Sequence, residues 1–187
     1  MKVILQLMLK HSTGRTVSVL FALTMAVYLT MLLYTIPAVT AFAPEFPIFD
    51  LSPSGYSFSY ANELLDKLGN EGRNIYLHRQ LPLDFIYPGL FAVTYSLLLV
   101  WLFRKYFNMN SKVYYLGFVP ILAGVFDYLE NIFIIKMINS FPDLQMNTVK
   151  IASTLTILKS SFTIFFFVLL LMGFVLFLKR KFMRIQK

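Results

Sequence analysis

Four long apolar stretches dominate this sequence and decide what it can fold into. They cover residues 16–42, 83–103, 113–137 and 151–178. A helix needs about 20 mostly apolar residues to cross the hydrocarbon core of a bilayer, and each stretch is at least that long. Because lipid offers the backbone no hydrogen-bonding partner, each stretch is expected to be helical. The sequence therefore predicts an all-α fold, an integral membrane four-helix bundle that forms a single domain over residues 1–187.

Composition supports this interpretation and removes several kinds of chemistry. Of the 187 residues, 58% are apolar and 14% are charged, whereas soluble domains average about 45–50% and about 25%. The chain has no Cys, which excludes disulfides, thiolate metal sites and a cysteine nucleophile. It also lacks the phosphate-binding and hydrolase motifs of soluble enzymes. With His11 and His78 as the only histidines, we expect no metal site and no cofactor, and the sequence leaves open whether the chain is an enzyme.

Basic residues gather in three segments beside the apolar stretches, at residues 1–15, 104–112 and 179–187. These segments hold 11 of the 17 Lys and Arg residues and no Asp or Glu. The positive-inside rule therefore predicts that both termini are cytoplasmic and that the connection 43–82 is extracytoplasmic. The basic tail adjoins a span, so it is interpreted as an anchor to anionic lipid rather than a nucleic-acid site. The first stretch is longer than the apolar core of a signal peptide, which favours a retained helix.

The connection 43–82 is too long to be a passive link. Its pattern predicts a short amphipathic helix that begins after Ser59 as N-cap, ends near Leu68 and stops at Gly69. Its apolar face would lie on the bundle mouth or on lipid headgroups. Two interpretations of this helix stay open, a structural cap and a lid over a site.

Ionisable residues inside the apolar stretches are the main clue to function, because such residues are costly in a bilayer and usually face a partner. Asp127, Glu130 and Asn131 recur at i, i+3 and i+4, so they share one helical face. Lys159 is expected at the same depth as Glu130, from the rise of a helix, and we predict an ion pair between them. Asp84 begins the second stretch.

These residues form a candidate polar site in the outer half of the bundle. Its expected members are Asp84, Tyr87, Asp127, Glu130, Asn131 and Lys159, with Arg73, Tyr76, His78 and Arg79 as contributors from the outer loop. One interpretation is a salt-bridged network that only fixes the helices. The other is a functional site, favoured because one ammonium cannot neutralise two carboxylates. Paired carboxylates could act as acid and base, bind a cation or hold an amine.

Several short motifs resemble those of a group of small four-span bacterial membrane proteins of unassigned activity. They are Gly55-Tyr56-Ser57, then Leu68-Gly69-x-Glu71-Gly72-Arg73-x-x-Tyr76, and Asp127-Tyr128-Leu129-Glu130-Asn131. The resemblance implies a four-helix membrane fold, and the bacterial inner (plasma) membrane as location. It implies no activity.

The function predicted from the sequence is that of a multi-pass membrane protein whose polar intramembrane site binds or acts on an amphipathic, lipid-like molecule. Membrane lipids are then its partners, and nucleic acid is not. The alternative is a non-catalytic accessory subunit or assembly factor, whose partners would be other membrane protein subunits.

Overall fold

The structure is a computed structural model that describes residues 2–108 and 110–185, with side chains up to residue 178. Over those residues it is all-helical, as predicted. Four of the described helical units are long and apolar enough to cross a membrane, namely Gly14–Thr40, Phe58–Arg104, Lys112–Ser140 and Met146–Leu178. The chain is a multi-span helical membrane protein. The side chains of the basic tail 179–187 lie outside the described residues.

Seven α-helices make up the described chain, and the longest connection between them runs from α3 to α4. In chain order they are α1 (Lys2–His11), α2 (Gly14–Thr30), α3 (Ile36–Thr40), α4 (Phe58–Ile75), α5 (Leu81–Arg104), α6 (Val119–Ser140) and α7 (Met146–Ile185). A π-helical turn at Met31–Thr35 joins α2 to α3, and another at Tyr76–Gln80 joins α4 to α5. Short 3₁₀ helices lie at Phe49–Leu51 and Lys112–Phe118.

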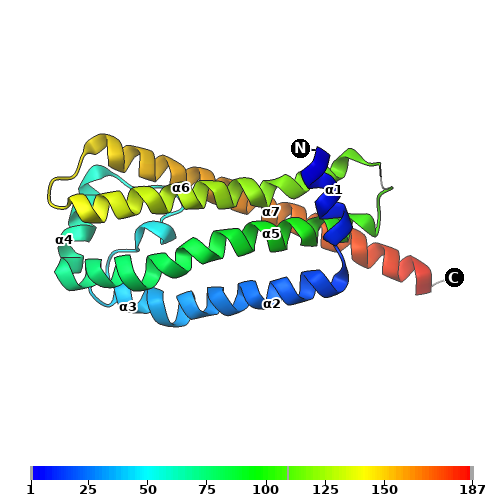
Figure 1. Cartoon of the computed structure of the whole chain (residues 1–187), viewed down its shortest axis with the longest axis horizontal. Helices are drawn as coiled ribbons and strands as arrows, with labels where there is room; N and C mark the ends of the chain where they lie inside the picture. The colour runs from blue at the N-terminus through cyan, green and yellow to red at the C-terminus, as the bar shows by residue number, and fades with distance from the viewer. Residues whose placement is uncertain (1, 109, 186–187) are drawn as a thin grey trace.

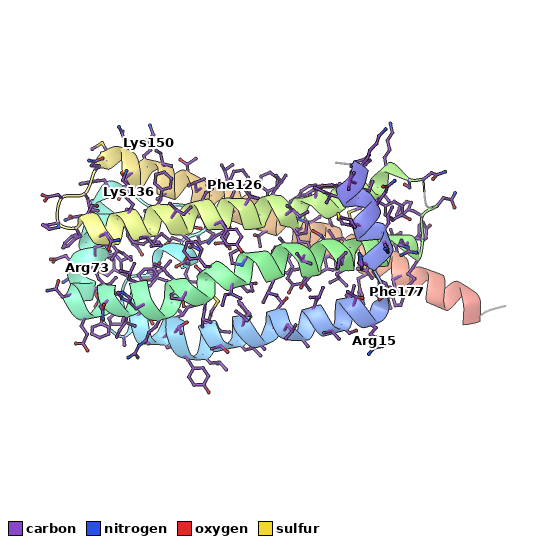
Figure 2. All side chains as sticks on the ribbon, in the orientation of Figure 1. Arg15, Arg73, Phe126, Lys136, Lys150 and Phe177 are labelled. Carbon is purple, nitrogen blue, oxygen red and sulfur yellow. The ribbon has the colours of Figure 1, made fainter. Side chains whose placement is uncertain are left out.

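Four helices run alongside one another and form the bundle (Figure 1). α5 packs on α2 and α6, and α6 packs on α7. We call the end that holds α3 and α4 the capped end, and the end that holds α1 and the connection 105–111 the terminal end. Figure 2 marks the capped end by Arg73, Lys136 and Lys150, and the terminal end by Arg15 and Phe177. The chain therefore crosses from one end to the other four times.

The amphipathic helix expected in the first long connection is present as α4, with different ends. Its N-cap is Ser57 rather than Ser59, because the Ser57 Oγ accepts a hydrogen bond from the Tyr60 amide at 3.1 Å. Gly69 breaks the helix with a φ of 60°, in the region that favours glycine. The expected stop is wrong, however, since the helix resumes and continues to Ile75. Arg73 spans the break by donating to the Leu65 carbonyl.

α4 lies across the capped end as a structural cap (Figure 1). Its buried face consists of Ala61, Leu64, Leu65 and Leu68, which pack in one apolar cluster with residues of α3, α6 and α7. Burying four such side chains contributes several kcal/mol, at about 25 cal/mol per Å² of apolar area. The cap therefore fixes the position of the loop that precedes it.

α5 and α6 approach closely at one glycine. A Cβ added at Gly124 would lie 2.8 Å from the carbonyl oxygen of Pro88, closer than real Cβ contacts allow. The polar residues Asp127, Glu130 and Asn131 lie farther along the same buried side of α6. This close packing of small residues brings the acidic face of α6 against α5.

Candidate functional site

Lys159 is the centre of a buried charge cluster. Its Nζ lies 2.5 Å from the Glu130 Oε2, 3.2 Å from the Asp127 Oδ1 and 4.0 Å from the Asp50 Oδ1. The predicted ion pair with Glu130 is therefore confirmed. Only 13% of the Lys159 side chain is exposed. The cluster joins α7 to α6 and to the loop that carries Asp50.

Glu130 is the most deeply buried of these acids. Its Oε1 accepts a hydrogen bond from the Thr156 hydroxyl at 2.6 Å, and the side chain is fully buried. The phenol of Tyr56, from the loop, lies near Thr156 and Glu130. Burial raises the pKa of Tyr56, with the charge of Glu130 adding to the effect, so the phenol keeps its proton. Glu130 is therefore held by the Thr156 hydroxyl and the Lys159 ammonium.

Asp50 reaches the cluster because its loop folds back into the capped end. The hydroxyl of Tyr76 donates to the Asp50 Oδ2 at 2.5 Å. Farther along the loop, Gly55 has a φ of 79°, and a Cβ there would lie 2.6 Å from the Ser153 Oγ of α7. The neighbouring amide of Tyr56 donates to that same Ser153 Oγ at 2.8 Å. The loop is thus attached to α7, and Tyr76 orients the carboxylate.

Asp84 stands opposite, at the start of α5. It is 4% exposed, and it lies close enough to Asp50 for the two carboxylates to repel each other. Its Oδ2 has no hydrogen-bond partner among the described residues. Asp84 thus adds an unpaired carboxylate oxygen to the cluster, beside a second acid.

The backbone of Asp84 is bound in an unusual way. Pro88 has no amide hydrogen, so the Asp84 carbonyl, four residues earlier, lacks its usual helical donor. The side chain of Asn131 supplies one, because its Nδ2 donates to the Asp84 oxygen at 2.8 Å. Asn131 therefore holds the first turn of α5 against α6 and positions Asp84.

A cavity of about 280 Å³ opens beside this cluster. Its polar lining is Asp50, Gln80, Asp84, Asp127, Lys159, Ser160 and Thr163. Its other walls are apolar or aromatic and include Met31, Ile36, Tyr87, Phe91 and Ala123. Two further lining residues, Tyr28 of α2 and Ile164 of α7, are 38% and 62% exposed. Leu51, from the loop, is another exposed lining residue, at 47%. The mouth therefore lies between α2, α7 and the loop that carries Leu51.

The structure brings most of the predicted site residues together. Asp84, Tyr87, Asp127 and Lys159 line the cavity, whereas Glu130 and Asn131 contact those residues from behind. Tyr76 does not line the cavity, but its hydroxyl donates to Asp50, which does.

Three of the expected loop contributors lie elsewhere. Arg73 donates to the Leu65 carbonyl and the Asn70 side chain and lies over the Phe141 ring. His78 and Arg79 are exposed. In the turn Tyr76–Gln80, Tyr76 and Gln80 point inward, whereas His78 and Arg79 point outward.

Two residues of the site were missed by sequence reasoning. Asp50 follows the apolar run from Phe46 to Phe49, a pattern that could have pointed to a buried loop. Gln80 precedes Asp84 by four residues and so shares its helical face. Gln80 is fully buried; its Oε1 accepts from the Thr35 hydroxyl, and its Nε2 has no partner in the described part of the chain.

A second, larger cavity of about 850 Å³ lies nearer the terminal end, between α2, α5 and α7. Its lining is almost wholly apolar and aromatic, including Phe21, Leu98, Trp101, Leu171 and Phe174. The same three helices line both cavities. α5 therefore lines two cavities. The smaller one has a charged inner end, and the larger one does not.

The charges limit what the site can do. Asp50, Asp84, Asp127 and Glu130 surround one ammonium, so protons or a bound cation must supply further positive charge if the cluster is to be neutral. Among the described residues, no group of three or more His, Cys, Asp and Glu side chains is placed to hold a metal ion. No protein-family model, curated protein or solved structure matches the chain. The cavity and its charged end are thus the features that indicate a function.

Proposed function

We propose that this protein binds or acts on an amphipathic, lipid-like molecule whose polar end occupies the smaller cavity. The observation that carries this proposal is the contrast between the two ends of that cavity. Carboxylates and Lys159 line the inner end, whereas the mouth is bordered by exposed side chains that are mainly apolar, those of Tyr28, Leu51 and Ile164. An apolar ligand would leave the buried polar groups without partners, and a wholly polar one would gain nothing from the apolar mouth.

The larger cavity provides a place for an apolar tail. It is lined by the same helices, α2, α5 and α7, and its aromatic walls match a hydrocarbon chain. A molecule with its head at Asp84 would leave the smaller cavity between Tyr28 and Ile164, and the end of its chain could then reach the larger cavity from outside the bundle.

The carboxyl groups also offer chemistry beyond binding. Asp84 and Asp127 line the cavity and could exchange protons with a group held between them. Asn131 and Lys159 hold these two acids in place, as a general acid or base requires. Binding and proton transfer at the same site are therefore both compatible with the proposal.

The orientation belongs to the same proposal. We place the terminal end in the cytoplasm of a bacterial cell, with the inner (plasma) membrane as location and the charge cluster in the outer half of the bilayer. The support is the positive-inside rule applied to the basic segments 1–15 and 104–112, whose described residues lie at the same end of the bundle. The ligand would then enter from the outer leaflet.

Two neighbouring serines of α7 give a matched test. Ser160 lines the smaller cavity, whereas Ser161 is exposed and is not among the residues that line it. We expect the purified protein to retain an amphiphile, and Ser160→Phe to reduce the retained amount severalfold while Ser161→Phe leaves it unchanged. Native mass spectrometry and analysis of extracted lipid measure this.

Two outcomes contradict the proposal. One is equal retention by the two variants, which would place any bound lipid outside the cavity. The other is a wild-type protein that carries no amphiphile but copurifies with another membrane protein in fixed ratio. That result would favour the accessory-subunit alternative.

A further inference from the structure

We infer that the amphiphile bound at the smaller cavity carries a cationic, ammonium-type head that binds between Asp50 and Asp84. The inference rests on the proposed function and names the ligand class. It depends on which carboxylates remain available once the charge of Lys159 has been assigned.

Lys159 is already paired. Its Nζ lies 2.5 Å from Glu130 and 3.2 Å from Asp127, and it is farther, at 4.0 Å, from Asp50. Two carboxylates at short distance more than balance one ammonium. The positive charge of Lys159 is therefore balanced by the two acids of α6.

Asp50 and Asp84 remain, and both line the cavity. The Asp84 Oδ2 and the Asp50 Oδ1 are buried and have no hydrogen-bond partner among the residues described. Asp84 is 96% buried, so bulk water does not compensate its charge. An ammonium donates several hydrogen bonds and supplies the missing charge, so it would satisfy both acids at once. A phosphate or carboxylate head would be repelled there.

The aromatic wall of the cavity favours an organic cation. The Tyr87 ring has its centroid 5.6 Å from that of Tyr28 and 5.9 Å from that of Phe91, and all three residues line this cavity. Aromatic faces attract organic ammonium groups through cation–π contacts. Carboxylates at one end and rings at the side form a site for an alkylated ammonium whose chain leaves through the mouth.

The test compares three photoactivatable probes that differ only in the head. Each has a 16-carbon chain with a diazirine at mid-chain, ending in a primary amine, an alcohol or a carboxylate. The purified full-length protein in detergent micelles is labelled over a range of probe concentrations, and mass spectrometry maps the labelled residues. We expect saturable labelling of the cavity walls by the amine probe, at roughly ten- to hundredfold lower concentration than by the alcohol probe.

The variants locate the cation. Asp84→Asn and Asp50→Asn should each weaken labelling by the amine probe roughly tenfold or more while leaving labelling by the alcohol probe unchanged, which also shows that the fold is intact. Asp66→Asn serves as the matched control, because Asp66 is exposed on the outer face of α4. It should change labelling by neither probe.

The outcomes separate this inference from the proposed function. Equal labelling of the cavity by all three probes, unaffected by Asp84→Asn, overturns the cationic head and leaves amphiphile binding in place. Absence of saturable labelling in the cavity by any probe overturns both. Preference for the carboxylate probe also contradicts the cation site, because it would show that Lys159 determines the charge of the ligand.

Discussion

The Nζ of Lys159 lies 2.5 Å from the Oε2 of Glu130, at the point where α7 packs on α6. Each residue has a further partner. The Thr156 hydroxyl donates to Glu130, and the Asp127 Oδ1 lies 3.2 Å from the Lys159 Nζ. Glu130 lies behind the cavity wall and holds Lys159, whereas Asp84 and Asp50 line the cavity itself. Support and binding are therefore assigned to different carboxylates, and they can be tested separately.

Breaking the pair should destabilise the protein strongly. Glu130→Gln and Lys159→Met each remove one partner of a buried ion pair, at a cost of about 3–5 kcal/mol in the free energy of unfolding. The double variant should cost less than the two single variants together, because it leaves no unpaired charge in that pair. Unfolding by sodium dodecyl sulfate in mixed micelles measures all three.

The control for this cycle is an exposed pair of the same residue types. Glu63 and Lys67 are exposed on α4, four residues apart. Glu63→Gln and Lys67→Met should each change the free energy of unfolding by about 0.5 kcal/mol or less. Strict additivity of the buried substitutions would show that Glu130 and Lys159 are not coupled.

The hydrogen bond from the Asn131 side chain to the Asp84 carbonyl predicts that the cost of removing Asn131 depends on Pro88. Asn131→Leu should cost about 1–3 kcal/mol of stability, because it leaves that buried carbonyl without a donor. In a Pro88→Ala background the new backbone amide can bond the same carbonyl, so Asn131→Leu should cost markedly less. The same micelle titration gives both values. An equal cost in the two backgrounds would mean that Asn131 stabilises the protein by another route.

Gly124 should tolerate no side chain. The Cβ of Gly124→Ala would lie 2.8 Å from the Pro88 oxygen, so α5 and α6 must separate, at about 1–3 kcal/mol. Gly14→Ala is the control, since its added Cβ would lie 3.6 Å from the nearest side-chain atom, the Nε1 of Trp101, an ordinary contact distance. We expect a lower melting temperature in detergent for the first variant alone. Similar melting temperatures for both would contradict the close contact.

Much of the fold follows from hydropathy because lipid imposes a minimum helix length and forbids unpaired backbone. The acidic face of α6 was predictable for the same reason, since Asp127, Glu130 and Asn131 recur at helical spacing inside an apolar stretch. The contact of Glu130 with Lys159 followed from matching depth in two antiparallel helices. Helical spacing and depth in the membrane can both be counted along the sequence, without knowledge of tertiary contacts.

The path of the long loop was not predictable in the same way. Asp50 enters the cluster only because the turn at Gly55 attaches the loop to Ser153 of α7, a contact between distant residues. Arg73 was expected near the site, but the break at Gly69 gives it the Leu65 carbonyl as a partner. Such contacts join residues that are far apart in the sequence, and no regular spacing of residue types indicates them.

The proposed orientation predicts where attached reporters lie. A reporter fused after Lys187 should be cytoplasmic, and one inserted near Asn70, in the exposed part of α4, should be extracytoplasmic. Paired phosphatase and fluorescent-protein fusions in a bacterial host measure both positions. The reverse pattern would place the charge cluster in the inner half of the bilayer.

Amphiphile binding in the smaller cavity is the central claim, and an experimental density map of the protein purified in lipid nanodiscs tests it most directly. Electron cryo-microscopy with a bound antibody fragment would provide such a map for a chain of this size. We predict elongated non-protein density with one end between Asp50 and Asp84 and the other leaving between Tyr28 and Ile164 toward the bilayer. A cavity closed by side chains, with lipid density confined to the outer surface of the bundle, would contradict the account.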